Sequence, residues 1–257
     1  MKWTIVAAVL LLAGCAQVDP GALPGDGRVD YQLGGAAPLA DRVTVVARDR
    51  TDPPAAGAYS ICYLNGFQTQ PQEMDFWLDE HPDLLLRDSD GDPFIDPDWP
   101  DEVMFDTTTP DNREALADVI GEWIDGCAHD GYQAVEFDNL DTFTRSDGAI
   151  TMDDNLALAT LLVARAHDSG LAAAQKNSGE IGARGRDEVG FDFAVVEECH
   201  EFNECGEFAE VWGDGFIDIE YSDTSRYESM CDDPDLPPLA VLRDRDLSPS
   251  VDPVFCD

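Results

Sequence analysis

Eight short apolar runs recur along the chain, and helical patterns separate several of them. The runs are rich in β-branched and aromatic residues, and several are apolar on both faces. That pattern is typical of strands in a parallel sheet that is covered on both sides. The expected strands are residues 31–33, 43–47, 59–64, 134–137, 171–174, 193–196, 216–219 and 239–242. A ninth apolar run, 103–105, is expected to belong to a loop insertion.

The clearest helical pattern begins at Thr109-Pro110, where a threonine cap precedes a proline at the first helical position. The apolar residues that follow fall on one face of a helix with 3.6 residues per turn. They are Leu116, Val119, Ile120, Trp123, Ile124 and Cys127. A second helix is expected from about residue 153 to residue 169, before Gly170, and a third over about 179–188.

Strands that alternate with helices predict a parallel sheet, and eight strands predict a (β/α)8 TIM barrel. We expect one such domain over residues 29–257, a length that suits this fold. A doubly wound open sheet is the alternative. The glycine-rich phosphate loops that often accompany that fold do not occur in the sequence.

The chain begins with MKWTIVAAVLLLAGC, in which Lys2 precedes an apolar run that is too short to span a bilayer. The last four of these residues resemble the bacterial lipobox, in which cleavage falls before the cysteine and the cysteine carries the lipid. We therefore expect a signal peptide over residues 1–14, a lipidated Cys15 and a flexible tether rich in Pro and Gly up to residue 28. A plain secretory signal is the alternative. The expected location is a membrane-anchored lipoprotein, exported to the cell surface or the periplasm, that touches the membrane only through its lipid.

The other six cysteines are an even number, which in an exported chain indicates three disulfides. Fifteen connectivities are possible for six cysteines. Proximity in the sequence favours Cys199 with Cys205 and Cys231 with Cys256, which leaves Cys62 with Cys127.

The chain is strongly acidic, with 54 Asp and Glu against 15 Lys and Arg and a formal net charge of −39. Recognition of phosphates needs Lys and Arg, so the charge argues against a nucleic-acid-binding protein. It also argues against docking on anionic lipid through a basic patch. A cationic substrate is favoured instead, although adaptation of the whole surface to salt would give the same charge. We expect a monomer.

The active site of a parallel barrel lies at the carboxyl ends of its strands. Polar residues follow nearly every expected strand: Arg48-Asp49, Asn65, Asp138-Asn139-Leu140-Asp141, Gln175-Lys176-Asn177, Glu197-Glu198, Glu220-Tyr221 and Arg243-Asp244. A ring of carboxylates with one lysine and several amides suits glycoside hydrolysis, which uses one carboxylate on each side of the scissile bond.

Several motifs spaced along residues 29–256 resemble glycoside hydrolase family 114. They are VDYQLGG (29–35), SICYLNGFQTQP (60–71), LLLRDSDG (84–91), VEFDNLD (135–141), QKN (175–177), FAVVEEC (193–199), IEY (219–221) and LRDRD (242–246). The resemblance implies a TIM barrel with endo-α-1,4-polygalactosaminidase activity. Its substrates are partly deacetylated galactosamine polymers, which are cationic and match the acidic chain.

The same resemblance implies that Asp138 is the nucleophile and Glu197 the general acid/base of a retaining mechanism. Glu136 and Asp141 remain alternatives to Asp138, and Glu198 remains an alternative to Glu197. The candidate substrate-binding residues are Asp49, Asn65, Asp88, Glu136, Asp141, Lys176, Asn177, Glu220 and Asp244. Two tryptophans of the loop 67–108, Trp77 and Trp99, are expected either to stack on sugar rings or to pack the loop.

No metal or cofactor is expected. The acidic segment 88–96 resembles a calcium loop, but Pro93 and Trp99 occupy the sixth and twelfth positions, where an EF-hand needs Gly and Glu. The four histidines form no HExxH motif, which argues against a zinc hydrolase. The alternative functions are a non-catalytic surface lipoprotein that binds carbohydrate and a calcium-dependent adhesion module.

Overall fold

A computed structural model describes residues 23–25 and 27–256. The expected signal peptide, Cys15 and most of the expected tether therefore lie outside the described residues. None of the helices in the described part of the chain is long and apolar enough to cross a membrane.

Eight parallel strands follow one another around the sheet in chain order. They are β1 (Arg28–Gln32), β2 (Val43–Asp49), β3 (Tyr59–Asn65), β4 (Ala134–Asp138), β5 (Ala172–Lys176), β6 (Phe193–Glu197), β7 (Phe216–Tyr221) and β8 (Leu239–Arg243). Strand β8 lies beside β1, and Arg243 bridges them by pairing with Asp30 and donating to the Tyr31 carbonyl at 2.6 Å. The consecutive order confirms the (β/α)8 barrel and rules out a doubly wound sheet, since that fold reverses its strand order.

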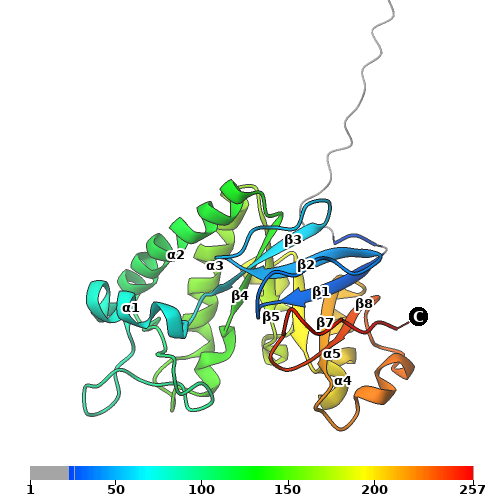
Figure 1. Ribbon diagram of the computed structural model, residues 1–257. Coiled ribbons are helices and arrows are strands. Elements are labelled where there is room, and N and C mark those ends of the chain that lie inside the picture. The colour runs from blue at the N-terminus through cyan, green and yellow to red at the C-terminus, as the bar shows by residue number, and fades with distance from the viewer. Residues whose placement is uncertain (1–22, 26, 257) are drawn as a thin grey trace, which may run out of the picture.

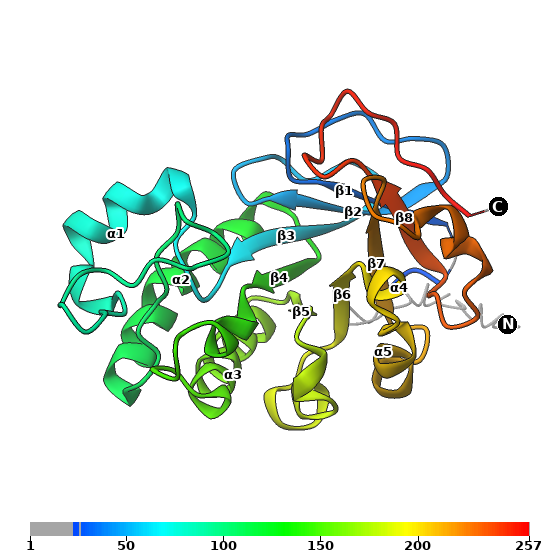
Figure 2. The same cartoon turned by 90° about the horizontal axis from the view of Figure 1, so that it is seen from below.

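The described residues form five α-helices, which lie outside the strands (Figures 1 and 2). They are α1 (Met74–Glu80), α2 (Pro110–Asp130), α3 (Met152–Asp168), α4 (Cys199–Phe202) and α5 (Cys205–Trp212). Short helical turns occupy Pro71–Glu73, Pro82–Leu84, Leu140–Thr144, Gly179–Ile181, Gly185–Val189 and Tyr227–Asp232. The two views place α2 and α3 together on one flank of the barrel and α4 and α5 on another.

The helix ends follow from local chemistry. The side chain of Thr109 accepts a hydrogen bond from the backbone of Asn112 at the start of α2, as its sequence predicts. Gly131 ends the same helix with φ of 96°, a conformation that favours glycine. The helix expected over 179–188 is wrong as a single element. Gly182, with φ of 52°, separates two short turns there, because that left-handed conformation cannot continue a right-handed helix.

Alternate residues of each strand face the barrel interior, and the others face the helices. The interior is apolar near the amino ends of the strands and contains Val29, Val45, Ile61, Ala134, Ala172, Ala174, Phe193, Ile217 and Val241. The outward residues pack under the helices with Leu116, Ile120 and Leu162. Because the inward residues of the strands turn polar only at their carboxyl ends, the polar cluster of the barrel sits above an apolar floor.

Three disulfides link elements of the barrel, with the pairing that sequence proximity favours. Cys62 on β3 bonds to Cys127 on α2, and Cys199 bonds to Cys205 across the α4–α5 junction. Cys231 bonds to Cys256, which ties the C-terminal segment to the turn after β7.

The long insertion between β3 and α2 contains α1 and a set of isolated backbone bridges. Residue Phe105 of the ninth apolar run bridges to Leu85, so this run belongs to the insertion as expected. Trp77 is fully buried, with its ring 4.3 Å from that of Phe105, so it packs the loop and is not exposed to a sugar. Trp99 is exposed.

Candidate active site

A buried lysine lies at the centre of the carboxylates at the barrel mouth. Lys176 ends β5, and its side chain is 1% exposed. Its Nζ lies 3.1 Å from Glu136 Oε1, 3.4 Å from Asp138 Oδ2 and 3.3 Å from Glu197 Oε2. It also donates to the hydroxyl of Tyr31 at 3.0 Å. Burial alone lowers the pKa of Lys176, but the three carboxylates outweigh it and hold that pKa well above its ordinary value.

Glu136 forms the floor of this cluster and is fully buried. Its Oε1 accepts a hydrogen bond of 2.6 Å from the Tyr31 hydroxyl, in addition to its contact with Lys176. Burial raises the pKa of Glu136 to about 7, although Lys176 and Tyr31 act against that rise. A carboxylate with no solvent exposure cannot reach a polymer in the mouth, so Glu136 is placed to support its neighbours.

Asp138 lies one inward position further along β4, with 19% of its side chain exposed. Its Oδ2 accepts from the Tyr63 hydroxyl at 2.6 Å, and its Oδ1 accepts from the backbone of Asn139 at 2.7 Å. Asn139 itself adopts a left-handed conformation with φ of 63°, which turns the chain directly after β4. Both oxygens of Asp138 are therefore fixed in direction while the group stays open to solvent.

Glu197 ends β6 on the other side of Lys176, and 26% of its side chain is exposed. Asn177 donates to Glu197 Oε2 at 3.2 Å and accepts from the Glu197 backbone at 2.8 Å. The Tyr221 hydroxyl makes a short hydrogen bond to Glu197 Oε1. The adjacent Glu198 instead pairs with Arg245 at 2.8 Å, so the two glutamates of the doublet have separate partners.

Two clefts flank the cluster. One of about 470 Å³ is lined by Tyr63, Asp49, Gly34 and Gln70, among others, and it adjoins Asp138 through Tyr63. The other, of about 370 Å³, includes Glu197, Asn177 and Asp141 in its lining. The paired carboxylates therefore lie between two hollows, in an arrangement that can hold an extended chain.

The sequence of residues 13–256 matches the model of glycoside hydrolase family GH114. This chain belongs to glycoside hydrolase family 114. It is therefore a glycoside hydrolase, and the family resemblance of its motifs is confirmed.

Solved structures share the fold of this family 114 enzyme. The galactosamine complex of Ega3 from Aspergillus fumigatus has a TM-score of 0.73 at 19% identity, and the match covers 95% of this chain and 99% of that one. The glycoside hydrolase domain of PelA from Pseudomonas aeruginosa has a TM-score of 0.56 at 13% identity, with 86% and 95% covered. No curated protein matches this chain in sequence.

Several residues that the sequence marks as substrate-binding candidates in this family 114 enzyme have other partners in the structure. Asp88 accepts from two backbone N–H groups of its own exposed turn. Glu220 is buried on the outward side of β7, where its Oε1 accepts from the backbone of His200. Asp244 accepts from the backbone of Ser248. None of these three side chains has a described contact with the Lys176 cluster.

The remaining candidates lie around the mouth of the enzyme. Lys176, Glu136 and Asn177 belong to the cluster itself. Asp49 accepts from Gln70 in the first cleft. Asp141 pairs with Arg145 at 2.7 Å beside the second cleft. Asn65 is buried next to Asp138 in the sheet and donates to Glu102 at 3.2 Å.

Sequence reasoning gave no role to three tyrosines and one glutamate of the site: Tyr31, Tyr63, Tyr221 and Glu102. Each tyrosine hydroxyl donates to one carboxylate of the cluster. Burial raises the pKa of all three tyrosines, which keeps them as neutral donors. Every second residue of a barrel strand faces the interior, so counting in steps of two from the apolar inward residues identifies the three tyrosines. Glu102 lies on a loop, where no such period applies.

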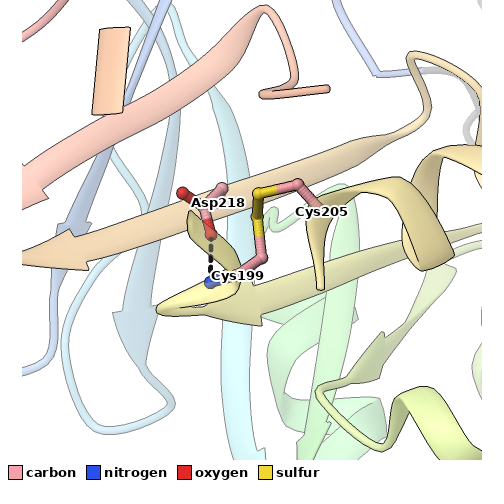
Figure 3. Close-up of side chains that lie close together, drawn as sticks. All are labelled: Cys199, Cys205 and Asp218. Atoms are coloured by element: carbon pink, nitrogen blue, oxygen red, sulfur yellow. Dashed lines mark hydrogen bonds between the residues drawn. A yellow bond between two sulfur atoms is a disulfide. The ribbon is translucent and has the colours of Figure 1, made fainter. Parts of the chain in front are cut away.

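Two other side-chain groups of the enzyme serve the fold. Cys199, Cys205 and Asp218 lie close together, but the sulfur atoms form a disulfide and offer no thiolate to a metal (Figure 3). Asp218 accepts from the Cys199 backbone at 3.2 Å and so fixes the start of α4.

His200 lies between Asp233 at 2.7 Å and Ser229 at 3.0 Å, an arrangement that resembles a nucleophile with its base. The Ser229 hydroxyl also lies 2.9 Å from the carbonyl of Arg226 and has that acceptor for its proton. We therefore assign these residues to the support of the turn after β7.

Proposed function

We propose that this enzyme hydrolyses α-1,4-linked galactosamine polymers with retention of configuration, with Asp138 as nucleophile and Glu197 as general acid/base. One observation carries the choice of these two residues. Of the three carboxylates that contact Lys176, these two are partly exposed, whereas Glu136 is fully buried. They end β4 and β6, at the end of the barrel where active sites of this fold lie.

The contacts of each carboxylate fit its role. Asp138 attacks the anomeric carbon while Glu197 gives its proton to the leaving glycosidic oxygen, so one carbon–oxygen bond forms as the other breaks. Water then attacks the same carbon, returns a proton to Glu197 and releases Asp138. Tyr63 and the backbone of Asn139 hold the nucleophile in direction. Because Lys176 contacts both carboxylates, they lie close together, which supports the short separation of a retaining pair.

Three observations support the choice of substrate. The chain carries a net charge of −39, which suits a cationic polymer. A similar structure, Ega3, was solved with galactosamine. Clefts lie on both sides of the carboxylate pair and suit a chain that continues past the cleaved bond, which favours endo action.

The test is the release of shorter oligomers from a partly deacetylated galactosamine polymer by the purified domain. Asp138→Asn and Glu197→Gln should each lower turnover by several orders of magnitude with unchanged circular dichroism. Asp168→Asn, an exposed residue at the far end of α3, is the charge-matched control and should keep full activity. Proton NMR of the first product should show the α anomer.

Binding of the polymer without any cleavage by the wild-type protein would favour the non-catalytic alternative. If Asp138→Asn and Glu197→Gln both keep their turnover, the assignment of Asp138 and Glu197 as catalytic residues is wrong. Loss of turnover in a Glu198→Gln variant but not in Glu197→Gln would move the acid/base role to Glu198.

We also propose that the enzyme is exported and anchored through a lipid on Cys15. The apolar run followed by Leu-Ala-Gly-Cys supports this proposal. Radiolabelled palmitate fed to an expressing bacterium should label the wild-type protein and not a Cys15→Ala variant. Equal labelling of the two would contradict it.

A further inference from the structure

Glu102 sits at the barrel mouth on the long insertion and is held there by two amides. Its Oε2 accepts from Asn65 Nδ2 at 3.2 Å and from Gln68 Nε2 at 2.6 Å. Both amide side chains belong to buried residues. Asn65 is itself fixed, because its oxygen accepts from the Gln68 backbone at 3.3 Å. The position of this carboxylate is therefore built into the structure.

This position is next to the proposed nucleophile. Asn65 on β3 is the register partner of Asp138 on β4, and parallel partners point to the same side of a sheet. Glu102 thus contacts the side chain of Asn65, the residue that lies beside Asp138 in the sheet. The two carboxylates also repel each other enough to affect the pKa of Glu102.

Glu102 lacks the cationic partner that the central carboxylates and Asp141 have. Lys176 neutralises the central cluster, and Arg145 pairs with Asp141 and Asp96. Across the described residues, Glu102 forms no ion pair, and its Oε1 accepts no hydrogen bond. The residue is partly exposed at the mouth, so Oε1 is open to a bound molecule.

The charge on Glu102 is correspondingly sensitive to its surroundings. Burial raises its pKa to about 7, the nearby Asp138 and Asp96 act in the same direction, and the two amides act against them. A cation beside Oε1 would favour the charged form and lower that pKa.

We propose that Glu102 binds the free ammonium group of the galactosamine unit whose anomeric carbon is attacked by Asp138, and that it thereby selects deacetylated units. The inference rests on the function proposed above. The amino group of galactosamine is on the carbon next to the anomeric carbon, so a residue that recognises it must lie close to the nucleophile. An acetylated unit offers only a neutral N–H, which leaves the charge on Glu102 unmatched in a partly buried site.

The test compares Glu102→Gln with Asp101→Asn on fully deacetylated and fully N-acetylated galactosamine oligomers of equal length. Glutamine keeps the size of Glu102 and an oxygen for its amides but removes the charge. Asp101 is the exposed neighbour on the same loop and gives the same change of net charge. Glu102→Gln should lower kcat/KM for the deacetylated oligomer about tenfold, as expected for one charge-assisted hydrogen bond. Its kcat/KM for the acetylated oligomer should stay the same or rise, and Asp101→Asn should change neither.

A pH series separates recognition from a merely structural role. The KM of the wild type for the deacetylated oligomer should rise as the pH falls below about 7, because Glu102 then gains a proton and loses its charge. That rise should be absent in Glu102→Gln and retained in Glu102→Asp, which keeps the charge.

The two proposals fail in different ways. If the wild type cleaves neither oligomer, the proposed function is wrong. If the wild type cleaves the deacetylated oligomer but Glu102→Gln lowers both activities equally, or neither, the role of Glu102 is overturned while the proposed function stands.

Discussion

Replacement of Lys176 by methionine tests whether one buried ammonium holds the three carboxylates of the mouth together. Methionine has a similar length and no charge. The variant leaves Glu136 fully buried without its cation, with Asp138 and Glu197 close by. We expect it to fold with a lower free energy of unfolding and to lose hydrolytic activity, since both proposed catalytic groups lose a fixed contact.

The contacts set the magnitude. At about 3.3 Å and an effective dielectric constant of about 20, each ion pair contributes roughly 5 kcal/mol before desolvation. Burial of the ammonium offsets much of that gain, and loss of one partner from a buried pair costs about 3–5 kcal/mol in measured cases. We expect a loss in this range at pH 8.

The loss should depend on pH. The pKa of Glu136 in the folded protein is already about 7, above its ordinary value of 4.5, and removal of Lys176 raises it further. When the pKa of a group is higher in the folded protein than in the unfolded protein, the group contributes its full stability at a pH below the unfolded-state pKa. That contribution is lost as the pH rises through the folded-state pKa. The destabilisation should therefore be small near pH 5 and large at pH 8.

Urea unfolding of Lys176→Met and the wild type at both pH values measures the effect. Adding Glu136→Gln to the variant should recover part of the loss at pH 8, because it removes the carboxylate that burial penalises most. A defect below about 1 kcal/mol at pH 8, or an equal defect at both pH values, would refute the reasoning.

Three further predictions concern the site, the fold and the charge. Tyr221→Phe removes a donor to Glu197 and should lower kcat at least tenfold with little change in melting temperature. The paired change Cys62→Ala with Cys127→Ala opens a link between residues 65 apart and should cost roughly 4 kcal/mol in urea unfolding. Denatured, unreduced wild-type domain should show no free thiol. The KM for a deacetylated polymer should rise steeply with salt, while an acetylated polymer shows little effect. Equal salt responses of the two polymers would show that the negative charge of the enzyme plays no part in the choice of substrate.

Most strands could be predicted because a barrel strand is covered on both sides, although the first, expected at 31–33, spans Arg28–Gln32. The run of apolar residues in a barrel strand is visible without knowledge of the neighbours, as in 193–196, which the structure extends by one residue to Glu197. The helix α2 could be predicted from its threonine cap and its apolar face. The helix expected over 179–188 failed because the backbone conformation of Gly182 is decided by its surroundings.

The polar residues at the strand ends could be predicted as a group but not sorted. Glu220 and Tyr221 are adjacent, yet only Tyr221 points to the cluster, because neighbouring strand residues face opposite sides. The acidic composition alone made each carboxylate look equally suitable, and only the family resemblance favoured Asp138 and Glu197. In the structure, their distances from Lys176 separate Asp138 and Glu197 from Asp88 and Asp244.

The sequence by itself therefore determined the barrel, the acidic character and the family, and it favoured the disulfide pairing that the structure shows. These depend on local pattern, on proximity in the chain or on composition. Tertiary structure alone decided that Lys176 joins carboxylates from β4 and β6, that tyrosines from three strands hold them, and that Glu102 reaches the mouth from a loop. Such contacts join residues far apart in the chain, and their strength depends on burial, which exists only once the barrel has formed.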